Sequence, residues 1–171
     1  MTSILMLIAP NNFRDEELLD PKKFFEKRGI KVTVVSTNIG EAAGMLGAKI
    51  MVDKIASDVS VDDYDAVVFV GGAGVEEYKL YKDDNFLCIA REALKANKIV
   101  GAICLAPMIL AAAGLLTGKR ATAFSSSKEF LESRGAIYTG ESIEQDGSII
   151  TADGPASVNL FASTIVECLR E

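Results

Sequence analysis

Short apolar runs alternate with amphipathic stretches along most of the chain. Residues 3–9, 31–36, 65–70 and 99–103 have the length and apolar content of buried strands. Helical spacing predicts helices over residues 15–28, 84–96, 107–116, 126–134 and 158–170, with Gly118 as the stop after the third of these. Strands separated by helices pair in parallel through right-handed crossovers. The pattern therefore predicts an α/β fold, a doubly wound three-layer sandwich with a mainly parallel sheet.

Two further segments have a different pattern. Residues 144–151 predict a hairpin, because Asp146-Gly147 is a strong turn signal between alternating residues. Residues 40–57 are ambiguous and could hold an extra hairpin. The sequence shows no linker, internal repeat or low-complexity segment, and its 171 residues suit one domain of ordinary size. We therefore expect a single domain over residues 1–171.

The predicted fold directs attention to three loops. In doubly wound sheets, ligands bind beyond the carboxyl ends of the strands. The loops that follow Ala9, Val70 and Ile103 all leave such ends. We expect any functional site to be built from these loops.

Composition and charge narrow the function classes. The formal net charge is −6 and lysine and arginine form no cluster, so nucleic acid is not an expected partner. No apolar run is long enough to cross a membrane, and the start of the chain lacks the basic segment of a signal peptide. We therefore expect a cytoplasmic protein without membrane contact.

The most informative feature of the composition is that the chain contains no histidine. Its absence excludes Ser-His-Asp and Cys-His catalysis within the chain, and histidine-ligated metals as well. The cysteines are Cys88, Cys104 and Cys168, an odd number at wide spacing, which argues against a disulfide framework or a zinc site. Neither a metal nor a cofactor is expected.

Cys104 stands where an apolar strand runs into a helix that begins within about three residues. This layout is typical of a nucleophile elbow, and Ala102 and Ala106 are small enough for its tight turn. Unpaired N–H groups and a helix N-terminus would lower the pKa of a thiol there. The alternative, a buried core cysteine, is equally compatible with the local pattern. Cys88 and Cys168 lack such a turn and are interpreted as small apolar packing residues.

Four segments together resemble the DJ-1/PfpI superfamily over essentially the whole chain. They are the sequence AICLAP at residues 102–107, the Gly71-Gly72 pair, the segment from Glu17 to Pro21, and Gly154-Pro155. The resemblance implies a flavodoxin-like fold and a homodimer or larger homo-oligomer. It also implies roles: Cys104 as the reactive cysteine, Glu17 as the acid that hydrogen-bonds its sulfur, and the N–H groups of Gly72 and Leu105 as donors to an oxyanion.

The chain also departs from that family's pattern. Leu105 stands where the peptidase-like members have a histidine, and an apolar side chain cannot act as a general base. Asp153 stands where DJ-1-like members often have an arginine, and it would repel an anionic ligand. Phe124 makes the expected pocket more apolar. These departures argue against a PfpI-type peptidase.

Three functions stay open on these residues. The first is a cysteine-dependent enzyme for a small-molecule substrate, acting on reactive aldehydes as a glyoxalase or deglycase does. The second is an oxidative-stress sensor or chaperone-like protein with an oxidisable cysteine. The third is a binding or oligomer-building module with a vestigial site. A dinucleotide site is excluded, because Glu77 occupies the position of the third glycine that its motif requires.

Overall fold

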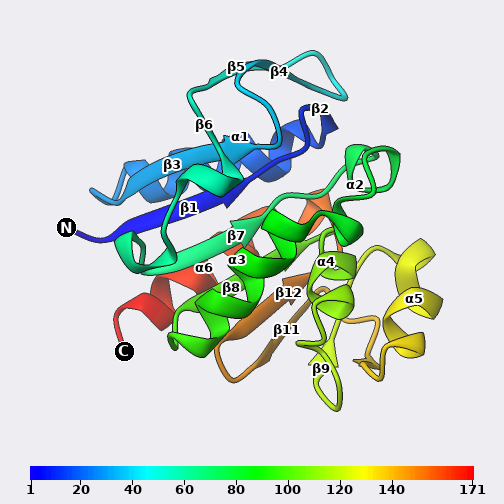
Figure 1. Ribbon diagram of the computed structural model, residues 1–171. Helices are drawn as coiled ribbons and strands as arrows, with labels where there is room; N and C mark the ends of the chain where they lie inside the picture. Colours follow the sequence, from blue (N-terminus) through cyan, green and yellow to red (C-terminus); the bar gives the residue numbers. More distant parts are fainter.

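A seven-stranded sheet forms the centre of the computed structural model, which describes residues 1–171 (Figure 1). Its strand order is β11-β12-β8-β7-β1-β3-β6. Every neighbouring pair is parallel except β11 and β12, which form the predicted hairpin. The bounds are β1 Ser3–Leu7, β3 Lys31–Ser36, β6 Lys54–Ile55, β7 Ala66–Phe69, β8 Ile99–Ile103, β11 Ile143–Asp146 and β12 Ile149–Ala152. The predicted mainly parallel sheet is confirmed.

Helices cover both faces of this sheet. On one face α1 (Asp15–Glu26) packs against α6 (Val158–Leu169), and on the other α3 (Asp84–Lys95) packs against α4 (Pro107–Ala112) (Figure 1). Because both faces are covered, β1, β7 and β8 are buried almost throughout, which explains their nearly continuous apolar runs. The three-layer α/β sandwich is confirmed. None of the helices has the length and apolar character needed to span a membrane.

A smaller sheet lies at the top of Figure 1, beside the carboxyl end of β1. It contains β2 (Asn11–Phe13), β4 (Gly40–Gly44) and β5 (Lys49–Val52). Residues 40–57 were ambiguous in the sequence, and the structure shows that they contain an extra hairpin, the antiparallel pair β4–β5. The sequence did not predict β2, since Asn11-Asn12 is polar and Asn12 has a positive φ of 58°.

The helix predicted over residues 107–116 is shorter than expected. It ends at Ala112, and Gly114 rather than Gly118 provides the stop. The N–H of Gly114 donates to the carbonyl of Ala111, and the N–H of Leu115 donates to that of Leu110, which is the Schellman pattern. Gly114 has a φ of 82°, which favours glycine at this position.

The remaining elements are short. They are α2 (Gly74–Glu77), α5 (Lys128–Ser133), β9 (Arg120–Ala121) and β10 (Ile137–Tyr138). Single 3₁₀ turns cover Ala56–Asp58, Val61–Asp63, Leu80–Lys82, Ser125–Ser127 and Pro155–Ser157. The last of these leads directly into α6, and the helix predicted over residues 158–170 is confirmed.

Candidate functional site

Cys104 occupies a left-handed turn between β8 and α4. Its φ is 63°, which is rare for a residue with a side chain and costs about 1–2 kcal/mol. Two hydrogen bonds hold the turn: the N–H of Cys104 donates to the carbonyl of Ala152 at 2.9 Å, and its own carbonyl accepts from the N–H of Phe124 at 2.8 Å. Pro107 is the first residue of α4. The predicted strand, sharp turn and helix are confirmed.

Glu17 lies on the buried side of α1. It shares that side with Pro21 and Phe25, which follow at intervals of four residues. The carboxyl group is completely buried, and Oε1 accepts a hydrogen bond from the N–H of Gly71 at 3.1 Å. Oε2 is buried and has no hydrogen-bond partner. The carboxyl group also lies within hydrogen-bonding reach of the Cys104 thiol.

Backbone N–H groups complete the surroundings of the sulfur. Those of Gly72 and Leu105 lie near the Cys104 sulfur, where they act to lower the pKa of the thiol. The loop after β7 passes so close that a Cβ on Gly71 would lie 2.6 Å from Cys104 Cβ and from Glu17 Oε1. The structure thus brings together all four residues that the resemblance implied. Glu17 comes from α1, Gly72 from the loop after β7, and Cys104 and Leu105 from the turn after β8.

Burial dominates the protonation of this pair. It raises the pKa of Glu17 to about 8, although hydrogen bonds from the Cys104 thiol and the Gly71 N–H act in the opposite direction. Burial, followed by the negative charge of Glu17, raises the pKa of Cys104 to about 12. The N–H groups of Gly72 and Leu105 lower that pKa, as the sequence predicted, but burial outweighs them. The prediction of a lowered pKa for Cys104 is therefore wrong.

The two shifts depend on one another. The charge of Glu17 exists only after Glu17 has lost its proton, so below about pH 8 this cause of the raised Cys104 pKa is absent. A protonated carboxyl group can instead donate a hydrogen bond to a thiolate and stabilise it. The two groups therefore titrate as a coupled pair, and at neutral pH Glu17 is protonated.

The raised pKa of Glu17 predicts a stability that depends on pH. Between about pH 4.5 and pH 8 the folded protein keeps a proton that the unfolded chain has lost. This stabilisation is complete below pH 4.5, decreases through the window and is lost above pH 8. We expect the free energy of unfolding to fall by roughly 3–5 kcal/mol across it. Urea denaturation at several pH values measures the fall. Glu17→Gln should remove it, whereas Glu16→Gln should not; equal slopes in wild type and Glu17→Gln would contradict the shift.

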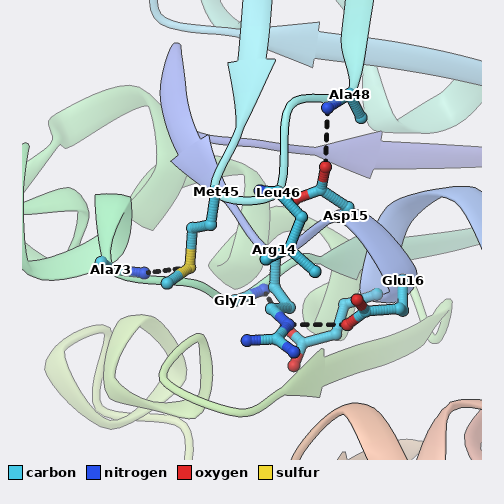
Figure 2. Close-up of polar contacts among 9 residues, drawn as sticks. Arg14, Asp15, Glu16, Met45, Leu46, Ala48, Gly71 and Ala73 are labelled. Atoms are coloured by element: carbon cyan, nitrogen blue, oxygen red, sulfur yellow. Dashed lines mark hydrogen bonds and ion pairs between the residues drawn. The ribbon is translucent and has the colours of Figure 1, made fainter.

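Arg14 and Asp15 are site neighbours that the sequence did not predict. The carboxylate of Asp15 accepts hydrogen bonds from the N–H groups of Leu46 at 2.8 Å and Ala48 at 2.7 Å (Figure 2). The sulfur of Met45 accepts from the N–H of Ala73 at 3.4 Å. These contacts fasten the turn between β4 and β5 over the loop that contains Gly72. The role of Asp15 could not be recognised in the sequence, because Asp15 belongs to a run of three acidic residues.

A surface pocket of about 310 Å³ lies on the other side of the elbow. The backbone N–H of Phe124 donates to the carbonyl of Cys104, and Phe124 also lines the pocket. Tyr138, Asp153 and Pro155 line it as well. The Asp153 carboxylate accepts a hydrogen bond from the Ser157 hydroxyl at 2.6 Å. A pocket of this volume suits a small molecule.

The other two cysteines lie away from this site. Cys88 is exposed on α3, where its thiol lies 3.4 Å from Oε1 of Glu92, so its interpretation as a packing residue is wrong. Cys168 is partly buried against the core, beside the amide nitrogen of Gln145. No group of three or more histidine, cysteine, aspartate or glutamate side chains is placed to hold a metal ion.

Comparison with known proteins agrees with this geometry. The family model for the DJ-1/PfpI family matches residues 2–168. An uncharacterized protein of Methanocaldococcus jannaschii is 45% identical over 170 residues, which cover 98% of this chain and 82% of that protein. A deglycase of Pyrococcus horikoshii is 27% identical over 97% of this chain and 99% of its own length. The crystal structure of a ThiJ/PfpI domain protein from Brachyspira murdochii superposes with a TM-score of 0.94 at 36% identity, covering 98% of this chain and 96% of that one. With its elbow cysteine, its flavodoxin-like sheet and this match over nearly all residues, the chain belongs to the DJ-1/PfpI family.

Proposed function

We propose that this protein is a cysteine-dependent enzyme that acts on small reactive aldehydes, with Cys104 as the nucleophile. The observation that carries the proposal is the completely buried Glu17, whose pKa is raised to about 8 and which lies within reach of the Cys104 sulfur. A carboxyl group in this state can give and take a proton near neutral pH. The relative from Pyrococcus horikoshii is named a deglycase, which agrees with aldehyde chemistry.

The proposed reaction begins with addition of the Cys104 sulfur to the aldehyde carbon. A carbon–sulfur bond forms, the π electrons of the carbonyl move to its oxygen, and that oxygen takes up the proton that leaves the thiol. The N–H groups of Gly72 and Leu105, which act to lower the pKa of the thiol, would stabilise the negative charge that develops beside the sulfur.

For an α-oxoaldehyde such as methylglyoxal, the carboxylate form of Glu17 would then remove the proton from the carbon bonded to sulfur and return it to the neighbouring carbon. The hydroxyl proton passes from the oxygen on the first carbon to the oxygen on the second, so the hemithioacetal becomes a thioester. Water hydrolyses the thioester to an α-hydroxy acid and restores the thiol. The net change is an isomerisation with uptake of one water molecule, so it needs no redox cofactor and no histidine.

Peptide hydrolysis lies outside this proposal. The leaving amine of a peptide needs a proton from a general acid. The neighbouring side chain is the apolar Leu105, and the chain contains no histidine. Cys104 is only 8% exposed, which also favours small substrates over a polypeptide.

Assembly and location belong to the same proposal. Members of the DJ-1/PfpI family are commonly oligomeric, and we propose a homodimer or larger homo-oligomer in the cytoplasm. Exposed apolar side chains on and beside the β4–β5 hairpin would supply contact surface; they are Ile39, Met45, Leu46 and Met51.

One experiment tests the function directly. We expect the purified protein to convert methylglyoxal to lactate, measured by proton NMR, with a rate that rises as the pair titrates near pH 8. Absence of lactate at every pH would reject the aldehyde chemistry. In that case the protein is treated with increasing amounts of peroxide and its intact mass is measured. Addition of two oxygen atoms confined to Cys104 would favour a function as an oxidation sensor.

A further inference from the structure

Arg14 brings a positive charge to the edge of the reactive pair. Its backbone N–H donates to the carbonyl of Gly71 at 2.9 Å, which fixes the residue against the loop that also binds Glu17 (Figure 2). The pKa of Arg14 is raised, first by its hydrogen bond with Glu16 and further by the charges of Glu16, Glu17 and Cys104. The guanidinium group is therefore close enough to act on the charge of the reacting sulfur.

Part of the Arg14 guanidinium is free to bind a ligand. Its Nε donates to Oε2 of Glu16 at 2.6 Å, and both side chains are about one-third exposed (Figure 2). The two terminal Nη groups take no part in any hydrogen bond of the protein. A partly exposed ion pair of this kind contributes about 0–1 kcal/mol, so it competes weakly with a second anion. The planar guanidinium suits a carboxylate, which it can bind through two parallel N–H donors.

The sheet places charges of opposite sign on the two sides of Cys104. Along its carboxyl edge the strands follow the order β12, β8, β7, β1. Asp153 follows β12 and Cys104 follows β8, whereas Arg14 lies against the loop after β7, on the side of β1. A molecule bound at Cys104 thus has a carboxylate on one side and a guanidinium on the other. An anionic end would be repelled by Asp153 and attracted by Arg14.

We propose that Arg14 makes this site selective for aldehydes that carry a carboxylate at the end remote from the reacting carbonyl. The inference rests on the proposed aldehyde chemistry and adds the class of substrate. Arg14 binds the carboxylate through its Nη groups, while the carbonyl lies between the Cys104 sulfur and the N–H groups of Gly72 and Leu105. Glu16 holds the guanidinium in place through Nε.

Paired substrates test this selectivity. Dioxovalerate is an α-oxoaldehyde with a terminal carboxylate, and its methyl ester is a neutral compound of nearly the same shape. We expect a higher kcat/KM for the acid than for the ester. Arg14→Gln should reduce that ratio roughly tenfold, mainly through KM, because a charge-assisted contact is lost. The matched control is Lys22→Gln, which removes one positive charge from the same helix about two turns away. An unchanged ratio in Arg14→Gln would overturn the proposal and leave the aldehyde chemistry intact.

A second measurement does not depend on turnover. Iodoacetate and iodoacetamide both alkylate a thiolate with loss of iodide, but only iodoacetate is negatively charged. Peptide mass spectrometry gives the rate of alkylation by iodoacetate divided by the rate with iodoacetamide at Cys104. Cys88 and Cys168 serve as internal references. Arg14→Gln should lower this ratio severalfold at Cys104 alone, and Glu16→Gln should raise it. If Arg14→Gln leaves the ratio unchanged, the selectivity is wrong even in a protein that turns over neither aldehyde.

Discussion

Replacement of Cys104 by alanine is expected to reduce lactate formation from methylglyoxal by at least about a thousandfold. The reason is that the proposed reaction has one nucleophile. Without the sulfur, neither the hemithioacetal nor the thioester can form, and the protons that Glu17 would move have no substrate carbon to leave or reach. The remaining rate should equal that of the buffer. Lactate is measured by proton NMR at matched protein concentration.

Serine at the same position sharpens this experiment. Cys104→Ser keeps a side chain of similar shape at the left-handed turn, but a hydroxyl is a far weaker acid than a thiol, so we expect it to be almost as inactive as alanine. Cys88→Ala and Cys168→Ala, at the exposed and partly buried free cysteines, should retain wild-type rates. Circular dichroism establishes that each variant is folded. Activity of Cys104→Ala within tenfold of wild type would place the chemistry elsewhere.

The strands and the elbow could be predicted because their causes are local. The runs over β1, β7 and β8 are apolar since both faces of the sheet are covered there, and this leaves a direct trace in the sequence. The turn at Cys104 follows from small neighbours and from a proline at the first helical position. These features need no knowledge of distant contacts.

The acidic run at the start of α1 shows where prediction from sequence ends. Asp15, Glu16 and Glu17 are alike in the sequence, yet one fastens the β4–β5 turn, one pairs with Arg14 at the surface and one is buried beside Cys104. Successive helical residues point about 100° apart, so their surroundings differ. The four-residue spacing of Glu17, Pro21 and Phe25 does mark the buried side, but what covers that side depends on the loops after β7 and β8.

The pKa of Cys104 could not be predicted for the same reason. The elbow and its N–H donors are local, and they do act to lower the pKa. The larger contribution comes from burial, which is set by the packing of the whole loop cluster around the sulfur. Arg14 is a similar case: its place in the sequence says little, and only its bond to Gly71 brings it to the site.

Replacement of Gly72 by alanine is expected to damage both stability and reactivity. Gly72 has a φ of 111°, and a Cβ there would meet the backbone N of Arg14, while the carbonyl oxygen of Asn12 would lie 2.6 Å away. Positive φ costs about 1–2 kcal/mol for alanine, and the clash with main-chain atoms adds roughly 2–3 kcal/mol. We expect the Tm to fall by about 10 °C. Alkylation of Cys104 should also slow, because the displaced loop carries the Gly72 N–H, which acts to lower the pKa of the thiol.

The β4 strand supplies a matched control for this clash. Gly40 has nearly the same backbone conformation, with a φ of 117°, but nothing lies within 4 Å of the Cβ it would carry. Gly40→Ala should therefore show only the conformational cost, a fall in Tm of about 4 °C, with normal Cys104 alkylation. The difference between the two variants measures the close approach of the loop after β7 to the segment before α1. Equal shifts in Tm would mean that the loop after β7 can move away from the segment before α1 at no cost in free energy. Tight packing of this loop would then not be the cause of the raised pKa values of Glu17 and Cys104.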